Sequence, residues 1–383
     1  MDIEESVRIY AAEIKKISDN IHNNPELGFE EHRACVLQTE YLREKGFIVS
    51  TPYGSLNTAF RAEYGQGDLA FAIISEYDAL PSGHACGHNL ICAAALAAGV
   101  AAQNFLKDNH ISGRIVIIGT PAEETHGGKI IMLNHGAFTD INALIICHPH
   151  SVYALDPGDL AASRFDIEFT GKAAHAAAAP SSGINALDAV NLLFAGVACW
   201  RQQLPPGGMV HGIITHGGDA PNIIPERTKA FFYLRSRDNQ IQKELETRFA
   251  NIAQGAALMT GTELKFNKLP NSYSADKMNQ PLRDSVFMTM HQLGMNPLEK
   301  YESPISTDYA NVSCQVPGVN FFFNIMEDCP AALHSEGFKN AAATDFGFEA
   351  AMKAAVVMAK TAIRFLDDAE FRQQVIAAHG KTQ

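Results

Sequence analysis

Two patterns of hydrophobic positions divide the chain. In the first 150 residues, a stretch with apolar residues at helical spacing (4–20) precedes continuous apolar runs at 69–77, 114–120 and 143–148, and the Ala-rich segment 90–106 favours a helix. Continuous apolar runs are typical of parallel strands that are covered on both faces. This part of the chain therefore predicts an α/β domain with a mostly parallel central sheet.

The second pattern begins near residue 160, where apolar and polar residues alternate as they do in antiparallel strands. The segments are, in chain order, a strand, a helix, two strands, a helix and a strand, at 164–171, 185–203, 211–218, 227–237, 240–260 and 263–268. That order is typical of a ferredoxin-like α+β domain. A long Ala-rich helix near 341–367 then resumes the first pattern, so the second domain is inserted into the first.

We therefore expect a discontinuous domain made of residues 1–162 and 273–383, interrupted by an inserted domain at 163–272. The length of 383 residues agrees with this division. A single hydrophobic core rarely grows beyond about 250–300 residues.

Charge and composition narrow the possible partners and the compartment. The formal net charge of −12 opposes nucleic-acid binding. The longest apolar stretch, 90–102, is shorter than the roughly 20 residues of a membrane span. The acidic N-terminus lacks the order of a signal peptide, and seven dispersed cysteines without a CxxC pair are typical of a reducing compartment. We expect a cytoplasmic protein without membrane or nucleic-acid partners.

Two constellations of reactive residues follow predicted strands. Asp78 comes where an apolar strand ends, and Cys86 and His88 stand one residue apart in a glycine-containing loop, a spacing that can serve a divalent metal. Glu123 and Glu124 follow the strand at 114–120. Adjacent carboxylates suit a site in which one binds metal and the other is a general base toward water.

Two further histidines complete a set of possible ligands. His148 stands directly beyond the apolar run 143–146, with His150 as a neighbouring alternative, and His334 lies in a later loop. Each feature alone also has an ordinary structural explanation. Together they offer five N, O and S ligands, which is about right for a two-metal site. These ligands are Cys86, His88, Glu124, His148 and His334.

Several long motifs resemble the aminoacylase and carboxypeptidase metallopeptidase family. They are HNNPELGFEEHRA (22–34), EYDALPSGHACGHN (76–89), GTPAEE (119–124), GKAAHAAAAPSSGINALDA (171–189), GGDAPNIIPERTKAFFYLRS (217–236) and STDYANVS (306–313). The nearest subgroup contains hydrolases of hippurate, indole-acetyl-amino acids and p-aminobenzoyl-glutamate. Its p-aminobenzoyl-glutamate hydrolase and aminoacylase-1-like dipeptidase branch looks closest.

The resemblance implies roles for individual residues of the metal site. Cys86 matches a bridging thiolate, and the four other candidate ligands match the remaining ligands of two divalent ions. Glu123 matches the general base, and Asp78 matches a carboxylate that orients a ligand. Zinc or manganese is expected, and the soft thiolate leaves cobalt and nickel open.

The inserted domain has implied roles as well. His175 matches a histidine that stabilises the oxyanion, often across a dimer, and Asn222 and Arg235 match positions that bind the substrate's carboxylate. A homodimer through the inserted domain is expected, because an antiparallel sheet with an open edge can pair across a two-fold axis.

These residues predict a metal-dependent amidohydrolase that cleaves the amide bond of N-acyl or N-aroyl amino acids, such as p-aminobenzoyl-glutamate-like substrates. A dipeptidase with the same mechanism remains open. Two alternatives belong to other classes: a thiol hydrolase that uses Cys86, and a catalytically silent protein that binds small molecules on the same fold.

Overall fold

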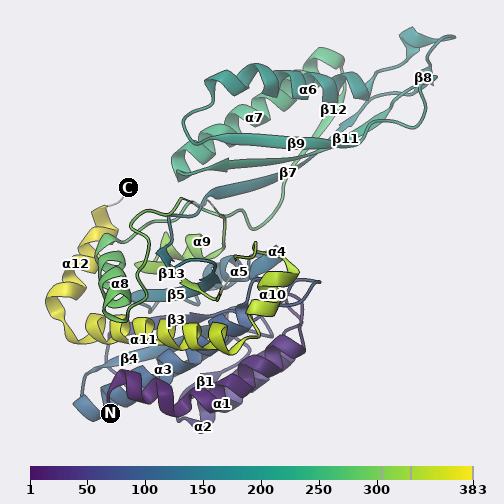
Figure 1. The fold of residues 1–383 in the computed structure, drawn as a ribbon. Coiled ribbons are helices and arrows are strands. Elements are labelled where there is room, and N and C mark those ends of the chain that lie inside the picture. Colours follow the sequence, from purple (N-terminus) through teal and green to yellow (C-terminus); the bar gives the residue numbers. More distant parts are fainter. Residues whose placement is uncertain (303–304, 328–329, 382–383) are drawn as a thin grey trace. The chain divides into compact units, whose positions relative to one another are not determined.

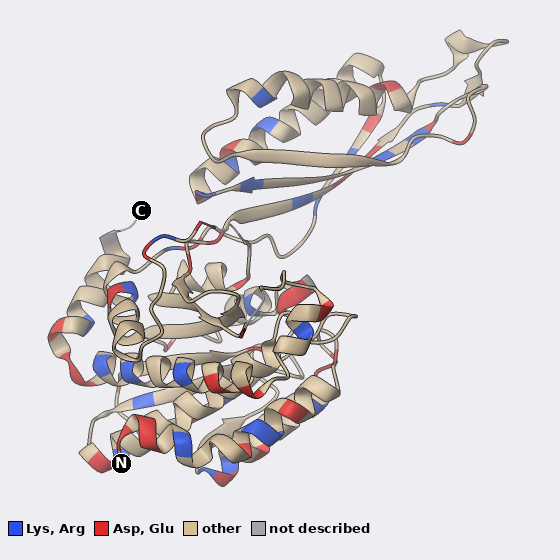
Figure 2. Ribbon diagram, viewed as in Figure 1, with Lys and Arg blue, Asp and Glu red and all other residues tan. Residues whose placement is uncertain are grey.

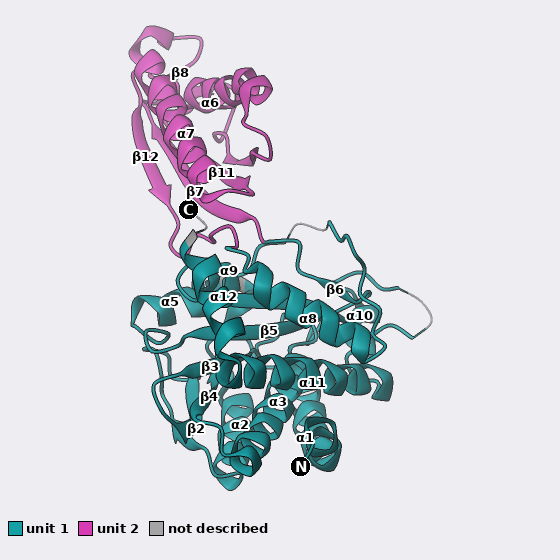
Figure 3. Cartoon of the chain, turned by 90° about the vertical axis from the view of Figure 1, so that its left-hand side faces the viewer, with its two compact units in different colours: residues 1–158, 277–383 teal, residues 159–276 magenta. Residues whose placement is uncertain are grey.

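The computed structural model describes residues 1–302, 305–327 and 330–381. The chain separates into two compact units (Figure 3). Unit 1 comprises Met1–Gly158 and Lys277–Gln383, and unit 2 comprises Asp159–Asp276. The joins expected from the sequence were after residues 162 and 272.

Unit 1 is built on a seven-stranded sheet in the order β1-β2-β4-β3-β5-β13-β6 (Figure 1). The four strands β4, β3, β5 and β13 are mutually parallel, whereas β1, β2 and β6 pair antiparallel with their neighbours. The strands are β1 (Ile48–Ser50), β2 (Phe60–Gln66), β3 (Ala70–Ser75), β4 (Gly113–Gly119), β5 (Ala143–His150), β6 (Ala154–Leu155) and β13 (Gly318–Asn324).

The α/β fold expected from the sequence is confirmed, but the sheet is mixed rather than mostly parallel. The parallel pairs are confined to the centre of the sheet. The outer strands run against the central ones because short turns reverse the chain. Three residues separate β2 from β3, and three separate β5 from β6, too few for the crossover that would keep successive strands parallel.

Helices cover both faces of the unit 1 sheet. On β3, Phe71 and Ile73 point into the core shared with α1, α3 and α11, whereas Ala72 and Ile74 point into the core shared with α5 and α9. The helices of unit 1 are α1 (Ile3–Asn23), α2 (His32–Glu44), α3 (His88–Asn109), α4 (Glu123–His126), α5 (Gly128–Asn134), α8 (Gln280–Gln292), α9 (Tyr309–Ser313), α10 (Glu336–Ala341), α11 (Asp345–Asp367) and α12 (Ala369–Lys381).

The helices α1 and α3 differ in the number of charged residues that they carry. Acidic and basic residues line α1, whereas α3 carries none before its last turn (Figure 2). By length and composition, α3 could cross a membrane, but 89% of its most apolar 18-residue window is buried inside the fold. It is therefore the core helix of unit 1.

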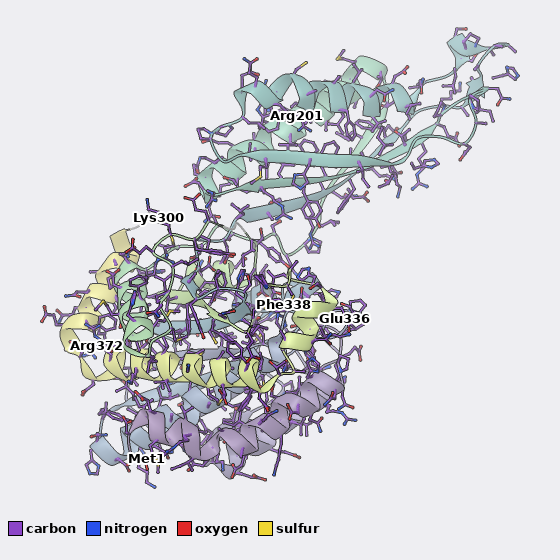
Figure 4. All side chains as sticks on the ribbon, viewed as in Figure 1. Met1, Arg201, Lys300, Glu336, Phe338 and Arg372 are labelled. Carbon is purple, nitrogen blue, oxygen red and sulfur yellow. The ribbon has the colours of Figure 1, made fainter. Side chains whose placement is uncertain are left out.

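The short helix α10 fixes the loop in front of it. Phe338 is buried in the unit 1 core, whereas Glu336 on the same helix is exposed (Figure 4). Ser335 caps the helix by accepting a hydrogen bond from the backbone N–H of Phe338. This anchor holds the preceding residue, His334, at a defined place.

Unit 2 is a four-stranded antiparallel sheet in the order β12-β7-β11-β9 with helices α6 and α7 packed on one face. The predicted ferredoxin-like order is confirmed. The elements are β7 (Ala161–Thr170), α6 (Ala186–Trp200), β9 (Met209–His216), β11 (Arg227–Ser236), α7 (Asn239–Thr260) and β12 (Glu263–Lys268).

Two features of unit 2 were not expected from the sequence. A two-stranded ribbon pairs β8 (Ala174–His175) with β10 (Ile223–Ile224). At the opposite end of β7, Ala162 and Tyr273 exchange two backbone hydrogen bonds of 2.9 Å. The chain therefore enters and leaves unit 2 at adjacent positions.

Candidate active site

The candidate residues of unit 1 gather where its parallel strands end. Asp78 follows β3, Glu123 follows β4, His148 lies near the end of β5, and His334 follows β13 after a longer loop. Because these four strands are neighbours and parallel, their carboxyl ends meet at one edge of the sheet, where α/β proteins bind ligands.

A tight turn joins Cys86 to His88. Gly87 between them has φ of 69° and precedes the first residue of α3. A Cβ at this position would lie 2.6 Å from a side-chain carbon of Pro149. Only glycine fits both the left-handed conformation and the space, so this residue lets the thiol and the imidazole approach the same site from a loop and a helix.

The two adjacent carboxylates begin the short helix α4. Ala122, directly before Glu123, is held in the left-handed region with φ of 59°. Its N–H donates a 2.8 Å hydrogen bond to Glu31, which also accepts a 2.8 Å bond from the hydroxyl of Thr58. Non-glycine residues in this conformation cluster at functional sites. Here the buried Glu31 side chain stabilises the turn that presents Glu123 and Glu124.

His88 and Asp78 form a buried pair. Nδ1 of His88 lies 3.0 Å from Oδ1 of Asp78, and Oδ2 of Asp78 accepts a 3.1 Å bond from the N–H of Glu124. Burial alone would raise the pKa of Asp78, but His88 and this N–H outweigh it and lower the pKa. Burial alone would lower the pKa of His88, but Asp78, Glu76 and Glu124 outweigh it and raise the pKa. Asp78 holds Nδ1 of the ring, so Nε2 is the nitrogen that faces the site.

Donor atoms converge in two groups that share one carboxylate. Cys86, Glu124 and His334 offer three donor atoms within 4.8 Å of one another, and His88, Glu123 and Glu124 offer another three. Glu124 belongs to both groups, whereas Cys86 belongs to one. Four of the five ligands expected from the sequence are therefore brought together directly, and His148 stands outside both groups.

Burial and neighbouring carboxylates oppose ionisation of two of these groups. Burial, followed by Glu124, raises the pKa of the Cys86 thiol. Burial, followed by Glu76 and Glu124, raises the pKa of Glu123 well above its usual value. A positive charge bound near these acidic groups would favour their ionised forms.

His148 is oriented by a chain of two side chains. Its Nδ1 lies 3.0 Å from Oδ1 of Asn320, whose Nδ2 donates a 2.5 Å bond to Asp156. Nε2 of His148 lies 3.3 Å from Oε2 of Glu76. The alternative His150 instead contacts the hydroxyl of Tyr301 at 2.9 Å through Nε2.

Three further residues beside this centre were not predicted from the sequence to belong to it. Glu76, Lys129 and Asp308 have fully buried side chains and form ion pairs of 2.6 and 2.7 Å through Nζ of Lys129. Period-two spacing could have indicated Glu76, because it stands two residues before Asp78 in an extended segment. Nothing local marks Lys129 as buried, since lysine is ordinarily a surface residue.

Unit 2 holds the three other predicted residues at two separate places. His175 and Asn222 are exposed and adjoin each other on the ribbon, where the N–H of Ala176 bonds to the carbonyl of Asn222 at 3.0 Å. Arg235 lies on β11 opposite Ala162, eight residues along from Arg227 at the ribbon end. Eight residues of strand span roughly 26 Å, so His175 and Arg235 do not share one site within unit 2.

The exposed imidazole of His175 has a defined tautomer. Its Nδ1 accepts backbone hydrogen bonds of 3.3 and 3.2 Å from Ala177 and Ala178. The neutral ring must therefore carry its proton on Nε2.

Arg235, at the other end of the sheet, stacks on a neighbouring ring. Its guanidinium carbon lies 5.4 Å from the centre of the Tyr233 ring, and this stacking stiffens the arginine side chain.

Comparison with known proteins agrees with this architecture. Residues 161–258 match the model of a peptidase dimerisation domain. The chain is 34% identical over 370 residues to the Xaa-Arg dipeptidase of Mus musculus, an alignment that covers 92% of this chain and 85% of the relative. It is 33% identical over 300 residues to one subunit of the p-aminobenzoyl-glutamate hydrolase of Escherichia coli, covering 73% of this chain and 62% of that subunit.

The fold is also found among solved structures. A dinuclear metal-binding peptidase of the M20 family from Bacillus subtilis superimposes with a TM-score of 0.67 at 20% identity. The match covers 92% of this chain and 99% of that protein. At this identity the likeness concerns the fold, which includes both the mixed sheet and the inserted domain.

Proposed function

Because this chain belongs to the M20 peptidase family, a family of dinuclear metal hydrolases that act on amide bonds, we propose that it cleaves the amide bond of N-acyl or N-aroyl amino acids such as p-aminobenzoyl-glutamate. The observation that carries the proposal is the convergence of two donor groups on Glu124, with Glu123 beside it. Such a pair supplies a ligand and a base in adjacent positions.

The side chains present fit divalent metal ions. With Nδ1 of each ring held by a hydrogen bond, Nε2 of His88 faces Glu124 at 3.7 Å, and Nε2 of His148 faces Glu76 at 3.3 Å. A ring nitrogen this close to a carboxylate oxygen needs a cation between the two atoms, which is a proton in the metal-free protein or a metal ion that replaces it. Oε1 of Glu124 is also buried without a hydrogen-bond partner among the described residues.

We assign the binding of two divalent ions to the five residues named from the sequence: Cys86, His88, Glu124, His148 and His334. Ions held there would lower the pKa of a water molecule and polarise the amide carbonyl. The mixture of thiolate, imidazole and carboxylate donors suits zinc or manganese, with cobalt and nickel as alternatives. Asp78 acts as a positioning residue through Nδ1 of His88.

Glu123 is the proposed general base and acid. It takes a proton from water as the water oxygen bonds to the carbonyl carbon, and it delivers that proton to the amine as the C–N bond breaks. Its raised pKa in the metal-free protein is expected to fall when positive charge is bound nearby. The products are a carboxylic acid and an amino acid.

Residues of unit 2 complete the proposed site. The Nε2–H of His175 is an exposed donor suited to an oxyanion, and Arg235 suits a two-pronged pair with the substrate's carboxylate. Because these two residues lie at opposite ends of the unit 2 sheet, we propose that His175 and Asn222 serve the site of a second copy, whereas Arg235 serves the site of its own chain.

This division requires a homodimer through unit 2, which agrees with the match of that unit to a dimerisation domain. We also propose a cytoplasmic location. The six described cysteines are free, including the exposed Cys199, which suits a reducing compartment.

A dipeptidase is the second candidate function. It is favoured by the similarity to the Xaa-Arg dipeptidase along 92% of this chain. The same groups would carry out both reactions, since a dipeptide is an N-acyl amino acid whose acyl group bears an amine.

Metal content and hydrolysis test the proposal together. Protein purified without added metal is assayed by mass spectrometry, and p-aminobenzoyl-glutamate, hippurate and a dipeptide ending in arginine are offered as substrates. We expect about two divalent ions per chain and release of an amino acid. Metal binding without hydrolysis of any small amide would favour a silent binding protein. No metal after reconstitution would contradict the proposal.

A further inference from the structure

The carboxylate of Glu76 occupies a position that no assigned role explains. Its side chain is fully buried, and its Oε2 lies 3.3 Å from Nε2 of His148 and 3.6 Å from Nε2 of His88. His148 lies outside both convergent donor groups, so Glu76 supplies the donor atom that links this histidine to His88.

Each of the two separations from Oε2 of Glu76, 3.3 Å to His148 and 3.6 Å to His88, matches that of two ligands on one ion. Donor atoms about 2.0–2.2 Å from a metal in a tetrahedral arrangement lie about 3.3–3.6 Å apart. The hydrogen bond from Nδ1 of His148 to Asn320 leaves a lone pair on Nε2 of the neutral ring, directed at an oxygen that is itself only an acceptor. The pair is stable when a cation, either a proton or a metal ion, lies between the two atoms.

A buried clamp holds this carboxylate in place. Lys129 donates from Nζ to Oδ1 of Asp308 at 2.7 Å, and its backbone N–H donates to Oδ2 of the same residue at 2.8 Å. Nζ also lies 2.6 Å from Oε1 of Glu76. Asp308 therefore fixes both the backbone and the side chain of Lys129. Lys129 pairs with Oε1 of Glu76, and Oε2 of Glu76 faces His148.

We infer that Glu76 is a further ligand of the divalent ion bound by His148, and that Lys129 and Asp308 are its positioning residues. This inference rests on the proposed metal-dependent function and adds a ligand to it. The ion pair with Lys129 holds Oε1 of Glu76 at 2.6 Å from Nζ. Lysine at this place also offsets the charge of the acidic groups around it.

The variant Glu76→Gln tests ligation. It leaves Lys129 paired with Asp308, so no buried charge loses its partner. Cobalt(II) is titrated into the metal-free protein against a chromophoric chelator, and its visible absorption is recorded. We expect one of the two ions to bind at least tenfold more weakly, with a changed spectrum for that ion, while the other ion is unaffected.

Asp308→Asn tests the clamp, because it keeps the shape of the side chain and the pair between Lys129 and Glu76. We expect affinity for the same ion to fall by about 10–100-fold, as when residues that support a ligand are changed. Glu63→Gln is the matched control, since Glu63 pairs with Arg61 and Arg114 on β2 and β4 of the same sheet and should leave both ions unchanged.

The outcomes separate this inference from the proposed function. Wild-type protein that binds no cobalt would contradict the function itself. Wild-type binding of two ions, with Glu76→Gln affinities within threefold, would overturn ligation by Glu76. A weaker ion with an unchanged spectrum would also overturn ligation. Wild-type affinity in Asp308→Asn would overturn the role of the clamp.

Discussion

Asn320 determines which nitrogen of His148 is free. Its Oδ1 lies 3.0 Å from Nδ1 of the histidine, and its amide nitrogen donates to the carboxylate of Asp156. Because the amide nitrogen of Asn320 donates to Asp156, its oxygen faces His148 and accepts the hydrogen on Nδ1 of that ring. The proposed metal ligand on β5 is thus oriented by a side chain of the neighbouring strand β13.

Replacing Asn320 with alanine should weaken metal binding without unfolding the protein. Loss of a group that orients a ligand typically costs 10–100-fold in metal affinity. Affinity is measured by competition with a chelator. Asn324→Ala is the control, because Asn324 lies on the same strand and its side chain bonds to the backbone of Met326. Equal affinities for the two variants would contradict the orienting role of Asn320.

Glu123→Gln should abolish hydrolysis while metal content stays at the wild-type level. The amide keeps the size of the side chain but cannot move the proton, so kcat should fall by about 10²–10⁴. Turnover and metal content are measured on the same preparation. Glu30→Gln, at an exposed position, controls for the loss of charge. A Glu123→Gln variant with most of its activity would show that another group is the base.

Removal of metal distinguishes the metalloenzyme from a thiol hydrolase. Treatment with a chelator should stop hydrolysis, and a divalent ion should restore it, because activation of water depends on bound metal. A hydrolase that uses Cys86 as its nucleophile would keep its activity in the chelator and lose it on alkylation of the thiol.

His175→Ala should lower kcat by about 10²–10³, the usual cost of an oxyanion donor, with metal content unchanged. Mixing this variant with Glu123→Gln under conditions that exchange subunits locates the histidine. If His175 serves a second copy, half of the dimers gain one intact site and about one quarter of wild-type activity returns. No recovery from confirmed heterodimers would place His175 in its own subunit's site.

The stability of the metal-free protein should depend on the titration of Glu31. Burial, followed by Asp78, raises the pKa of Glu31 to about 7, whereas an unfolded glutamate titrates near 4.3. Between these pH values the folded state keeps a proton that the unfolded state loses, so the free energy of unfolding falls as pH rises and levels off above about 7.

Glu31→Gln should remove that part of the pH dependence. The wild-type free energy of unfolding should drop between pH 4.5 and 7 by up to about 3 kcal/mol more than that of the variant, at 1.36 kcal/mol per pKa unit. Urea unfolding at several pH values measures the difference. Parallel profiles for the two proteins would mean that Glu31 titrates normally.

The candidate site residues at strand ends could be predicted from the sequence. Asp78, Glu123 and His148 stand where continuous apolar runs meet polar residues, and parallel strands bring such positions to one edge. The central strands β3, β4 and β5 were predicted from the same apolar runs, whereas β13 was not named from the sequence. The edge strand β6 and the β8–β10 ribbon were not predicted, because two residues carry no periodic pattern.

The buried charges could not be predicted in the same way. Lys129 and Asp308 lie 179 residues apart in sequence, and each resembles a surface residue until its partner is known. Glu76 stands in a polar motif in which sequence reasoning assigned a role to Asp78 and none to Glu76. A buried ion pair is a tertiary feature, and only the fold brings its members together.

The adjacent ends of unit 2 affect how this protein is made. Ala162 and Tyr273 pair through their backbones, so a folded unit 2 holds the two segments of unit 1 close and reduces the entropy lost when they join. During synthesis, β5 remains an uncovered edge until β13 emerges after residue 318. Early folding of unit 2 would shorten the time in which that edge can pair with another nascent chain.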